Sequence, residues 1–223
     1  MRRKIYERLL KWKREEAGRY ALMLEGARRV GKSWIVEAFA EQEYEHHLIL
    51  DFATVKRSVK ELFEDKLDDL DEFFLLLEAR TGIPLVRGKT VVVFDEVQRF
   101  PRAREAIKYL VADGRFHYIE TGSLISIKKN VEGIVIPSEE IKVQMHPMDF
   151  EEFLWAIGRE GVWPLVEKRF AARQPMGQVD HRLLMEYFRQ YLVVGGMPQA
   201  VAAFAAEKRL DEAERAKRAI LDL

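Results

Sequence analysis

Eight consecutive residues have the types and spacing of a phosphate-binding loop. The pattern G-x-x-x-x-G-K-S/T is matched in full by Gly26, Ala27, Arg28, Arg29, Val30, Gly31, Lys32 and Ser33. The two glycines permit a close approach, so that backbone N–H groups can converge on phosphate oxygens. Lys32 would reach the β- and γ-phosphates, and the Ser33 hydroxyl would coordinate Mg²⁺. The loop therefore predicts binding of a nucleoside triphosphate with magnesium.

The elements around this loop suit the same role. Tyr20 to Leu24 is an apolar run typical of a buried strand, and residues 34–40 carry apolar side chains at helical spacing. A helix that begins at the loop would direct its positive N-terminal end at the phosphates. We count Arg28, Arg29 and Trp34 among the nucleotide-binding candidates, although either arginine could instead face solvent.

A second apolar run ends in two acids. Val91 to Phe94 reads as a strand buried on both faces, and Asp95 and Glu96 follow it directly. Ligands of open α/β sheets bind at this end of the strands. Asp95 would lie near the magnesium, and Glu96 could polarise the attacking water. The alternative is a buried strand that ends in two acids and has no catalytic role. The phosphate loop upstream makes this alternative the weaker interpretation.

A third strand is expected over residues 116–123, after a crossover helix over residues 102–113. If this strand lies between the other two, its end faces the γ-phosphate. Thr121 or Ser123 would then sense that phosphate or the attacking water through its hydroxyl group. The alternative is a simple turn, and the sequence does not distinguish the two hydroxyl groups.

The motifs together favour ATP as the substrate. The Asn-Lys-x-Asp segment by which GTPases read the base is absent, and small nucleotide kinases need no Glu after the metal-binding Asp. We therefore predict an α/β fold of the P-loop NTPase class, in the ATP-hydrolysing division with an additional strand between the loop strand and the acidic strand. Its parallel sheet would be flanked by helices.

The amino-acid composition narrows the class of protein further. The chain has 223 residues, 48% of them hydrophobic, with 37 basic and 37 acidic side chains and no cysteine. Balanced charge gives no support for nucleic-acid binding, and the basic run from Arg2 to Arg14 reads more readily as a solvated helix face. No apolar run reaches the length of a membrane span, and we expect a cytoplasmic protein. Residues 61–72 are typical of an amphipathic helix surface.

Four segments resemble one known family. They are the phosphate loop, residues 94–101 (FDEVQRFP), the Thr121-Gly122-Ser123 turn, and residues 146–154 (HPMDFEEFL). In this order they look like the prokaryotic AAA-superfamily ATPases that carry a C-terminal domain of unknown function. The resemblance implies an ATP-dependent switch or motor, and Gly195-Gly196-Met197-Pro198 resembles the turn of that family's helical lid.

The resemblance also implies a domain organisation. We expect an AAA-type ATP-binding domain over residues 1–158 and a small α-helical lid over residues 159–223, truncated before a further domain. Breaks at residues 158–161 and 174–177 would separate the lid helices, and a helix from His181 to the Gly195 stop would turn residues 183, 184, 187, 188, 191 and 192 towards the core. By the resemblance, Pro198 lies against adenine.

One element of the family pattern is missing. An Arg often follows a Gly shortly before the segment at 146–154, whereas here Ile134 follows Gly133. An arginine finger would have to come from elsewhere in the chain or from a neighbouring subunit, as in a homo-oligomer. This gap leaves two alternatives beside the Mg²⁺-dependent ATPase. One is an ATP-gated module with little turnover whose lid is read by an unknown protein partner, and the other is an ATP-dependent machine acting on DNA.

Overall fold

The computed structural model describes residues 1–123 and 138–221, which pack into two compact units. The core unit is Ile5–Met145, and the helical unit joins Met1–Lys4 to His146–Leu223. The chain therefore passes between the units twice, after Lys4 and after Met145. The expected division of the chain at residue 158 into two domains stays a prediction.

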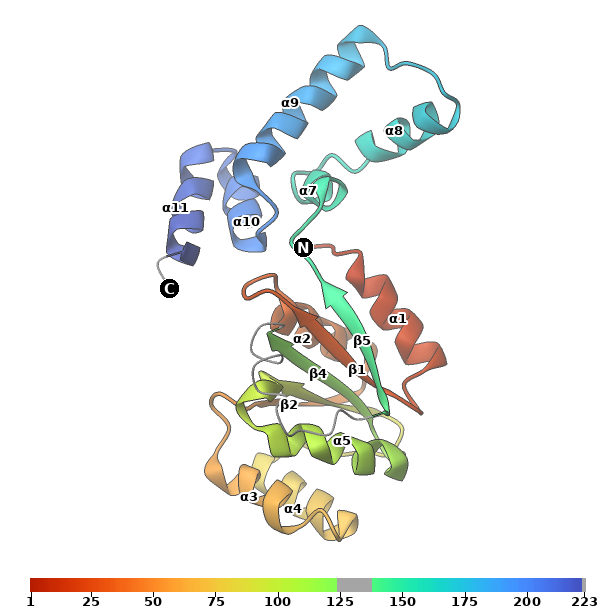
Figure 1. The fold of residues 1–223 in the computed structure, drawn as a ribbon, viewed down its shortest axis with the longest axis vertical. Coiled ribbons are helices and arrows are strands. Elements are labelled where there is room, and N and C mark those ends of the chain that lie inside the picture. The colour runs from red at the N-terminus through yellow and green to blue at the C-terminus, as the bar shows by residue number, and fades with distance from the viewer. Residues whose placement is uncertain (124–137, 222–223) are drawn as a thin grey trace. The chain divides into compact units, whose positions relative to one another are not determined.

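A parallel sheet forms the centre of the core unit (Figure 1). Its strands are β1 (Ala21–Gly26), β2 (His46–Asp51), β3 (Thr90–Asp95), β4 (His117–Ser123) and β5 (Glu140–Met145). They run in the order β2-β3-β4-β1-β5, and every neighbouring pair is parallel. Because β4 lies between β1 and β3, the predicted position of the additional strand is confirmed.

Helices cover both faces of this sheet. They are α1 (Ile5–Glu15), α2 (Lys32–Glu43), α3 (Arg57–Asp65), α4 (Leu70–Thr81), the 3₁₀ turn η1 (Val97–Arg99) and α5 (Pro101–Asp113). Leu22 and Leu24 of β1 pack with α1 and α2, whereas Met23 packs with the cluster formed by α3, α4 and α5. This alternation explains why β1 and β3 carry runs of consecutive apolar side chains, since both faces of these strands are buried. The predicted α/β P-loop fold is confirmed.

The acidic stretch at residues 61–72 corrects one expectation. It is not a single helix, because α3 ends at Asp65 and α4 begins at Leu70. The side chain of Asp69 accepts hydrogen bonds from the backbone N–H groups of Asp71 and Glu72. An Asp in this position caps the start of a helix, so the amphipathic pattern continues across an interruption between two helices.

The helical unit consists of α7 (Phe150–Ala156), α8 (Val162–Ala171), α9 (Gln178–Val194), α10 (Pro198–Glu207) and α11 (Leu210–Leu221). The breaks predicted around residues 158–161 and 174–177 are confirmed, and Gly195 (φ 78°) ends α9. The predicted core face of α9 is wrong at its edges, since Leu183 is 45% and Leu192 is 64% exposed. Leu192 lies off the stripe that runs through Tyr187, Tyr191 and Val194, whereas Leu183 lies on it, four residues before Tyr187, and is exposed because the buried part of the stripe begins only at Tyr187.

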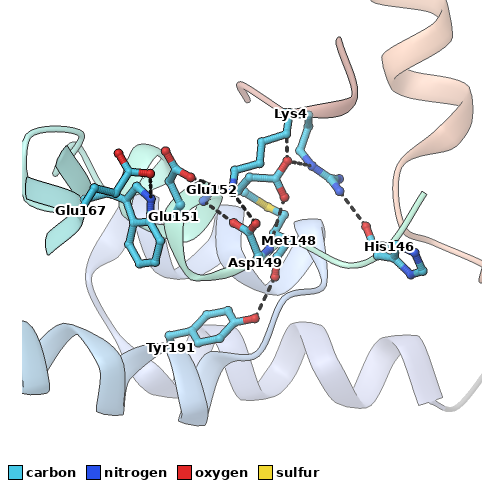
Figure 2. A network of polar contacts seen from close by, with 10 residues as sticks. Lys4, His146, Met148, Asp149, Glu151, Glu152, Glu167 and Tyr191 are labelled. Atoms are coloured by element: carbon cyan, nitrogen blue, oxygen red, sulfur yellow. Dashed lines mark hydrogen bonds and ion pairs between the residues drawn. The ribbon is translucent and has the colours of Figure 1, made fainter. Parts of the chain in front are cut away.

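The start of α7 holds the N-terminal segment in place (Figure 2). Asp149 and Glu152 form a capping box, in which each side chain accepts a bond from the other residue's backbone N–H. Glu152 also pairs with Arg3 at 3.1 Å and accepts from the Lys4 N–H at 2.7 Å. Arg3 reaches the carbonyl oxygen of His146 at 2.7 Å. We call Arg3, Lys4, Asp149 and Glu152 the α7 network.

Over the described residues, none of the helices has the length and apolar character needed to span a bilayer.

Candidate functional site

The loop from β1 to α2 has an unusual backbone at two residues. Gly31 (φ 94°) and Arg29 (φ 65°) are both left-handed, a conformation that suits glycine and strains arginine. Gly26 is required for a different reason, because a Cβ atom there would lie 2.3 Å from the carbonyl oxygen of Met145 on β5. One glycine thus shapes the loop and the other lets two strands approach.

Lys32 is the first residue of α2 and is 6% exposed. Its Nζ donates to the carbonyl oxygens of Gly26 at 3.0 Å and Ala27 at 2.8 Å. Burial lowers the pKa of the Lys32 ammonium, while the nearby charges of Glu96 and Asp95 oppose that shift. The cation is therefore folded onto the loop that a phosphate would enter.

Asp95 joins two hydroxyl groups that come from different elements. The Ser33 hydroxyl at the start of α2 donates to Asp95 Oδ1 at 3.0 Å, and the Thr121 hydroxyl of β4 donates to the same oxygen. The Glu96 N–H lies 3.4 Å from Thr121 Oγ1. The predicted magnesium residues and one predicted sensor are thus neighbours, although they are far apart in sequence.

The oxygen set fits a magnesium ion that keeps several waters. Mg²⁺ is commonly held by one or two carboxylates, water and substrate phosphates, and one carboxylate with one hydroxyl is what Asp95 and Ser33 offer. No group of three or more His, Asp or Glu side chains that could hold a metal ion occurs within residues 1–123 and 138–221. An all-protein metal cage is therefore not part of the described structure.

Glu96 has a left-handed backbone (φ 54°) and caps η1. Gln98 Nε2 donates to Glu96 Oε2 at 2.5 Å, which fixes the carboxylate by a contact that the sequence analysis did not anticipate. Ser123, the other sensor candidate, is 4% exposed and pairs in register with Gly26, two residues beyond Thr121 on β4. Of the two hydroxyl candidates, Thr121 is the one with a hydrogen bond to Asp95.

A cavity of about 410 Å³ opens beside these groups. The predicted residues that line it are Arg28, Arg29, Gly31, Lys32, Ser33, Trp34, Asp95 and Glu96. Three further lining residues, Asp51, Ala53 and Arg99, were missed. Asp51 could have been found, since it is the last residue of β2 after an apolar run as Asp95 is the last residue of β3, and the two are register partners. Arg99 belongs to the segment at 94–101 that resembles the family, but its spacing predicts no role in the site.

Two expectations fall outside this geometry. Pro198 is the first residue of α10 in the helical unit, where Gly196 approaches the backbone of Met148. Its predicted contact with adenine stays a prediction. Gly133 and Ile134, where the family arginine is missing, lie outside the described residues.

The fold and the site define a class of protein. A glycine loop between β1 and the start of α2 faces an acidic pair at the end of β3, and β4 lies between the two strands. This arrangement is that of a P-loop NTPase of the ATPase division. A family model described as an AAA domain matches residues 18–154, more than half of the chain. The chain belongs to this AAA domain family, and the AAA-superfamily assignment is confirmed.

Similar solved structures agree on the fold. A Walker-type ATPase of Pyrococcus abyssi is 16% identical with a TM-score of 0.53, over 98% of this chain and 72% of that one. The ORC1 protein of Aeropyrum pernix, solved in complex with DNA, is 12% identical with a TM-score of 0.50, over 99% of this chain and 66% of that one. No curated protein matches the sequence.

Proposed function

We propose that this chain hydrolyses ATP with Mg²⁺ at the cavity beside the β1–α2 loop. The observation that carries the proposal is that the hydroxyl groups of Ser33 and Thr121 both donate to one oxygen atom of Asp95. The buried Lys32 ammonium group lies close enough to Asp95 to feel its charge. Membership of the AAA domain family supports nucleotide binding and ATPase activity in general.

Glu96 is the proposed general base. It accepts a proton from the attacking water, whose oxygen bonds to the γ-phosphorus while the bond to the bridging oxygen breaks and ADP leaves with the electron pair. The products are ADP, inorganic phosphate and one proton. The bond from Gln98 holds one Glu96 oxygen in place, and the other remains to meet the water.

The other residues bind and position. Lys32 and the N–H groups of the loop hold the phosphates, and Ser33 with Asp95 holds the magnesium, which when bound neutralises phosphate charge. Thr121 is the preferred γ-phosphate sensor, because its hydroxyl bonds to Asp95 and can report a change there. Trp34 is 51% exposed at the cavity wall, so it can contact nucleotide beyond the phosphates.

The physiological role is proposed as that of a switch or motor in the cytoplasm. Residues 159–223 would form a lid whose position depends on the bound nucleotide, with Pro198 against adenine. The lid would act on a protein partner or a second copy of the chain. Exposed apolar side chains of α8 and α9, among them Phe170 (85% exposed) and Val179 (77%), give such a partner apolar surface to contact.

The test is steady-state ATP turnover with Mg²⁺ over a range of protein concentrations. Glu96→Gln should keep ATP affinity and lose at least about 100-fold in turnover, as expected for a general base. Lys32→Ala should weaken ATP binding itself, about 100-fold, when measured by calorimetry. Unchanged turnover in the first variant would remove Glu96 from the reaction, and unaltered affinity in the second would remove the loop assignment.

Two other outcomes identify the alternatives. Tight binding without turnover in the unmodified chain would indicate the ATP-gated module. DNA-stimulated turnover that falls steeply with salt would indicate a DNA-acting machine. The balanced charge of this chain does not favour that machine, and the DNA bound to the Aeropyrum pernix ORC1 protein belongs to a chain that is only 12% identical.

A further inference from the structure

Three arginines follow Glu96 closely, Arg99 in η1 and Arg102 and Arg104 in α5, and they have different surroundings. Arg104 is 4% exposed and pairs with Glu140 at 3.0 Å. Arg102 pairs with Glu105 at 3.1 Å and donates to the carbonyl oxygen of Phe63. Arg99 has an exposed guanidinium group for which the described part of the chain offers no hydrogen-bond or ion-pair partner. Arg99 is one of the residues that line the 410 Å³ cavity.

The backbone of Arg99 is fixed although its side chain is not paired. The Arg99 N–H donates to the Glu96 carbonyl at 2.9 Å, and Val97, two residues before Arg99, is fully buried. The following Phe100 stacks on Phe52, with ring centroids 5.3 Å apart. A turn with a fixed backbone therefore carries an unpaired arginine at the cavity, so little backbone entropy is lost when an anion binds, and the ordering cost is that of one side chain.

The carboxylates that share the cavity are already bound by other donors. Asp95 accepts from Ser33 and Thr121. Glu96 accepts from Gln98. Asp51 closes its own turn, accepting from the Ala53 N–H and the Thr54 hydroxyl, each at 2.8 Å. Arg99 thus borders three acids in the cavity wall and pairs with none of them, which leaves its five donors for an anion from outside the chain.

We propose that Arg99 contacts the terminal phosphate of a bound nucleoside triphosphate within the same chain. It would stabilise the charge that develops on the γ-phosphate and on the bridging oxygen as the bond breaks, without accepting a proton or forming a covalent bond. This inference rests on the proposed ATPase function. It supplies, from the turn after the acidic pair, the cation that the Gly133-Ile134 sequence lacks.

Arg99→Ala is the decisive variant, with Arg102→Ala as its control. Arginine contacts of this kind are worth about 10³–10⁵ in turnover, so we expect a loss of at least about 100-fold for Arg99→Ala. Arg102→Ala removes an arginine three residues away whose partners lie outside the cavity, and should leave turnover within about twofold. Equal turnover in the unmodified chain and in Arg99→Ala overturns the proposal.

A binding measurement is independent of turnover. In the Glu96→Gln background, calorimetry gives the affinities for ATP and for ADP with Mg²⁺. Because Arg99 contacts the phosphate that ADP lacks, adding Arg99→Ala should reduce the preference for ATP over ADP about tenfold while ADP affinity stays the same. Loss of affinity for both nucleotides alike, or for neither, contradicts a contact with the terminal phosphate.

Mixing two inactive variants separates action within one chain from action between chains. Arg99→Ala and Glu96→Gln each lack one residue, and a mixture regains turnover only if Arg99 of one subunit serves the site of another. We expect no recovery, and recovery would overturn the assignment within one chain. Failure of the proposed function appears differently, as absent turnover and nucleotide affinity that Lys32→Ala does not change, and that result would overturn both proposals.

Discussion

The α7 network and the cavity of the core unit are built from the same kinds of side chain and use them differently. In the α7 network, Arg3 and Glu152 are about 5% exposed and bond to each other, and Glu152 also closes a capping box with Asp149 (Figure 2). In the core unit, Arg99 lines a cavity of about 410 Å³ and has no side-chain partner among the described residues.

The difference separates charges that hold the fold from charges that await a ligand. A buried ion pair whose hydrogen bonds are satisfied adds little net stability, but removing one partner costs much, since the other charge stays buried. Removing an unpaired cation from a cavity wall should change the free energy of unfolding little, but it should weaken nucleotide binding or turnover strongly. We therefore expect substitutions in the α7 network to change the free energy of unfolding and those in the cavity to change nucleotide affinity or turnover.

Arg3→Met should have the largest effect on stability. It leaves the buried Glu152 carboxylate without its cation, although the N–H groups of Lys4 and Asp149 still donate to it. We expect a loss of about 3 kcal/mol, the lower end of the range for a broken buried pair. Urea unfolding followed by the fluorescence of Trp155 and Trp163, both in the helical unit, measures it. Lys4→Ala, which breaks the partly exposed ion pairs of Lys4 with Asp149 and Glu151, should cost less than about 1 kcal/mol, and equal losses would contradict the distinction.

Gly26→Ala tests whether the first glycine of the loop is needed for the stability of the core unit. Its new Cβ atom would meet the Met145 carbonyl oxygen at 2.3 Å, so β1 and β5 must move apart. We expect a loss of about 2–3 kcal/mol in thermal or urea unfolding of the core unit. Gly18→Ala is the matched control, because nothing lies within 4 Å of a Cβ atom there. Similar stability in the two variants would mean that the strands adapt.

Glu120→Gln tests a buried acid that belongs to neither region. Burial first, and the charge of Glu140 second, raise the pKa of Glu120 well above 4.5. The folded chain then keeps a proton that the unfolded chain loses, so the free energy of unfolding falls as pH rises above the unfolded value. Glu120→Gln should therefore gain about 1–2 kcal/mol at pH 7 and little at pH 4, as measured by urea unfolding at both pH values. A Glu120→Gln variant that is less stable than the unmodified chain at pH 7 would contradict the prediction.

Asp149→Ala should have the smallest of these effects. It removes the side-chain acceptor for the Glu152 N–H, at 2.9 Å, and leaves the buried pair of Glu152 with Arg3 intact. Loss of a helix cap costs about 1 kcal/mol. Asp149→Asn, which keeps an acceptor oxygen, should restore most of this in the same fluorescence experiment. A loss as large as that of Arg3→Met would indicate that the cap and the ion pair act as one unit.

Much of the fold follows from local patterns. The strand that ends in Asp95 and the breaks on either side of α8 carry strong periodicity and turn signals, and the structure contains them. The helix predicted over residues 61–72 is wrong, because hydrophobic periodicity does not register a break that Asp69 caps. Leu183 and Leu192 were predicted to face the core and are exposed, because the sequence gives the period of a helix, whereas the elements packed against it decide how long and how wide its buried face is.

The site was predictable as a set of residues and less so as a geometry. Lys32, Ser33, Asp95 and Glu96 were identifiable from their motifs, and they line one cavity. Gln98 and Arg99 belong to the segment at 94–101 that resembles the family, but their role was not predicted, because nothing in their type or spacing indicates which groups they contact. Their positions depend on η1, whose path is fixed by the buried Val97 and by contacts of Phe100 with the aromatic core.

By itself the sequence determined the class of this protein, since a phosphate loop and an acidic strand end are local patterns with local physical causes. The tertiary structure decided which hydroxyl meets Asp95, why Gly26 must be glycine, and which arginine reaches the cavity unpaired. Each of these depends on atoms brought together by the order of parallel strands. A local pattern can specify a strand or a loop, whereas strand order is set by burial of both sheet faces over the whole core unit.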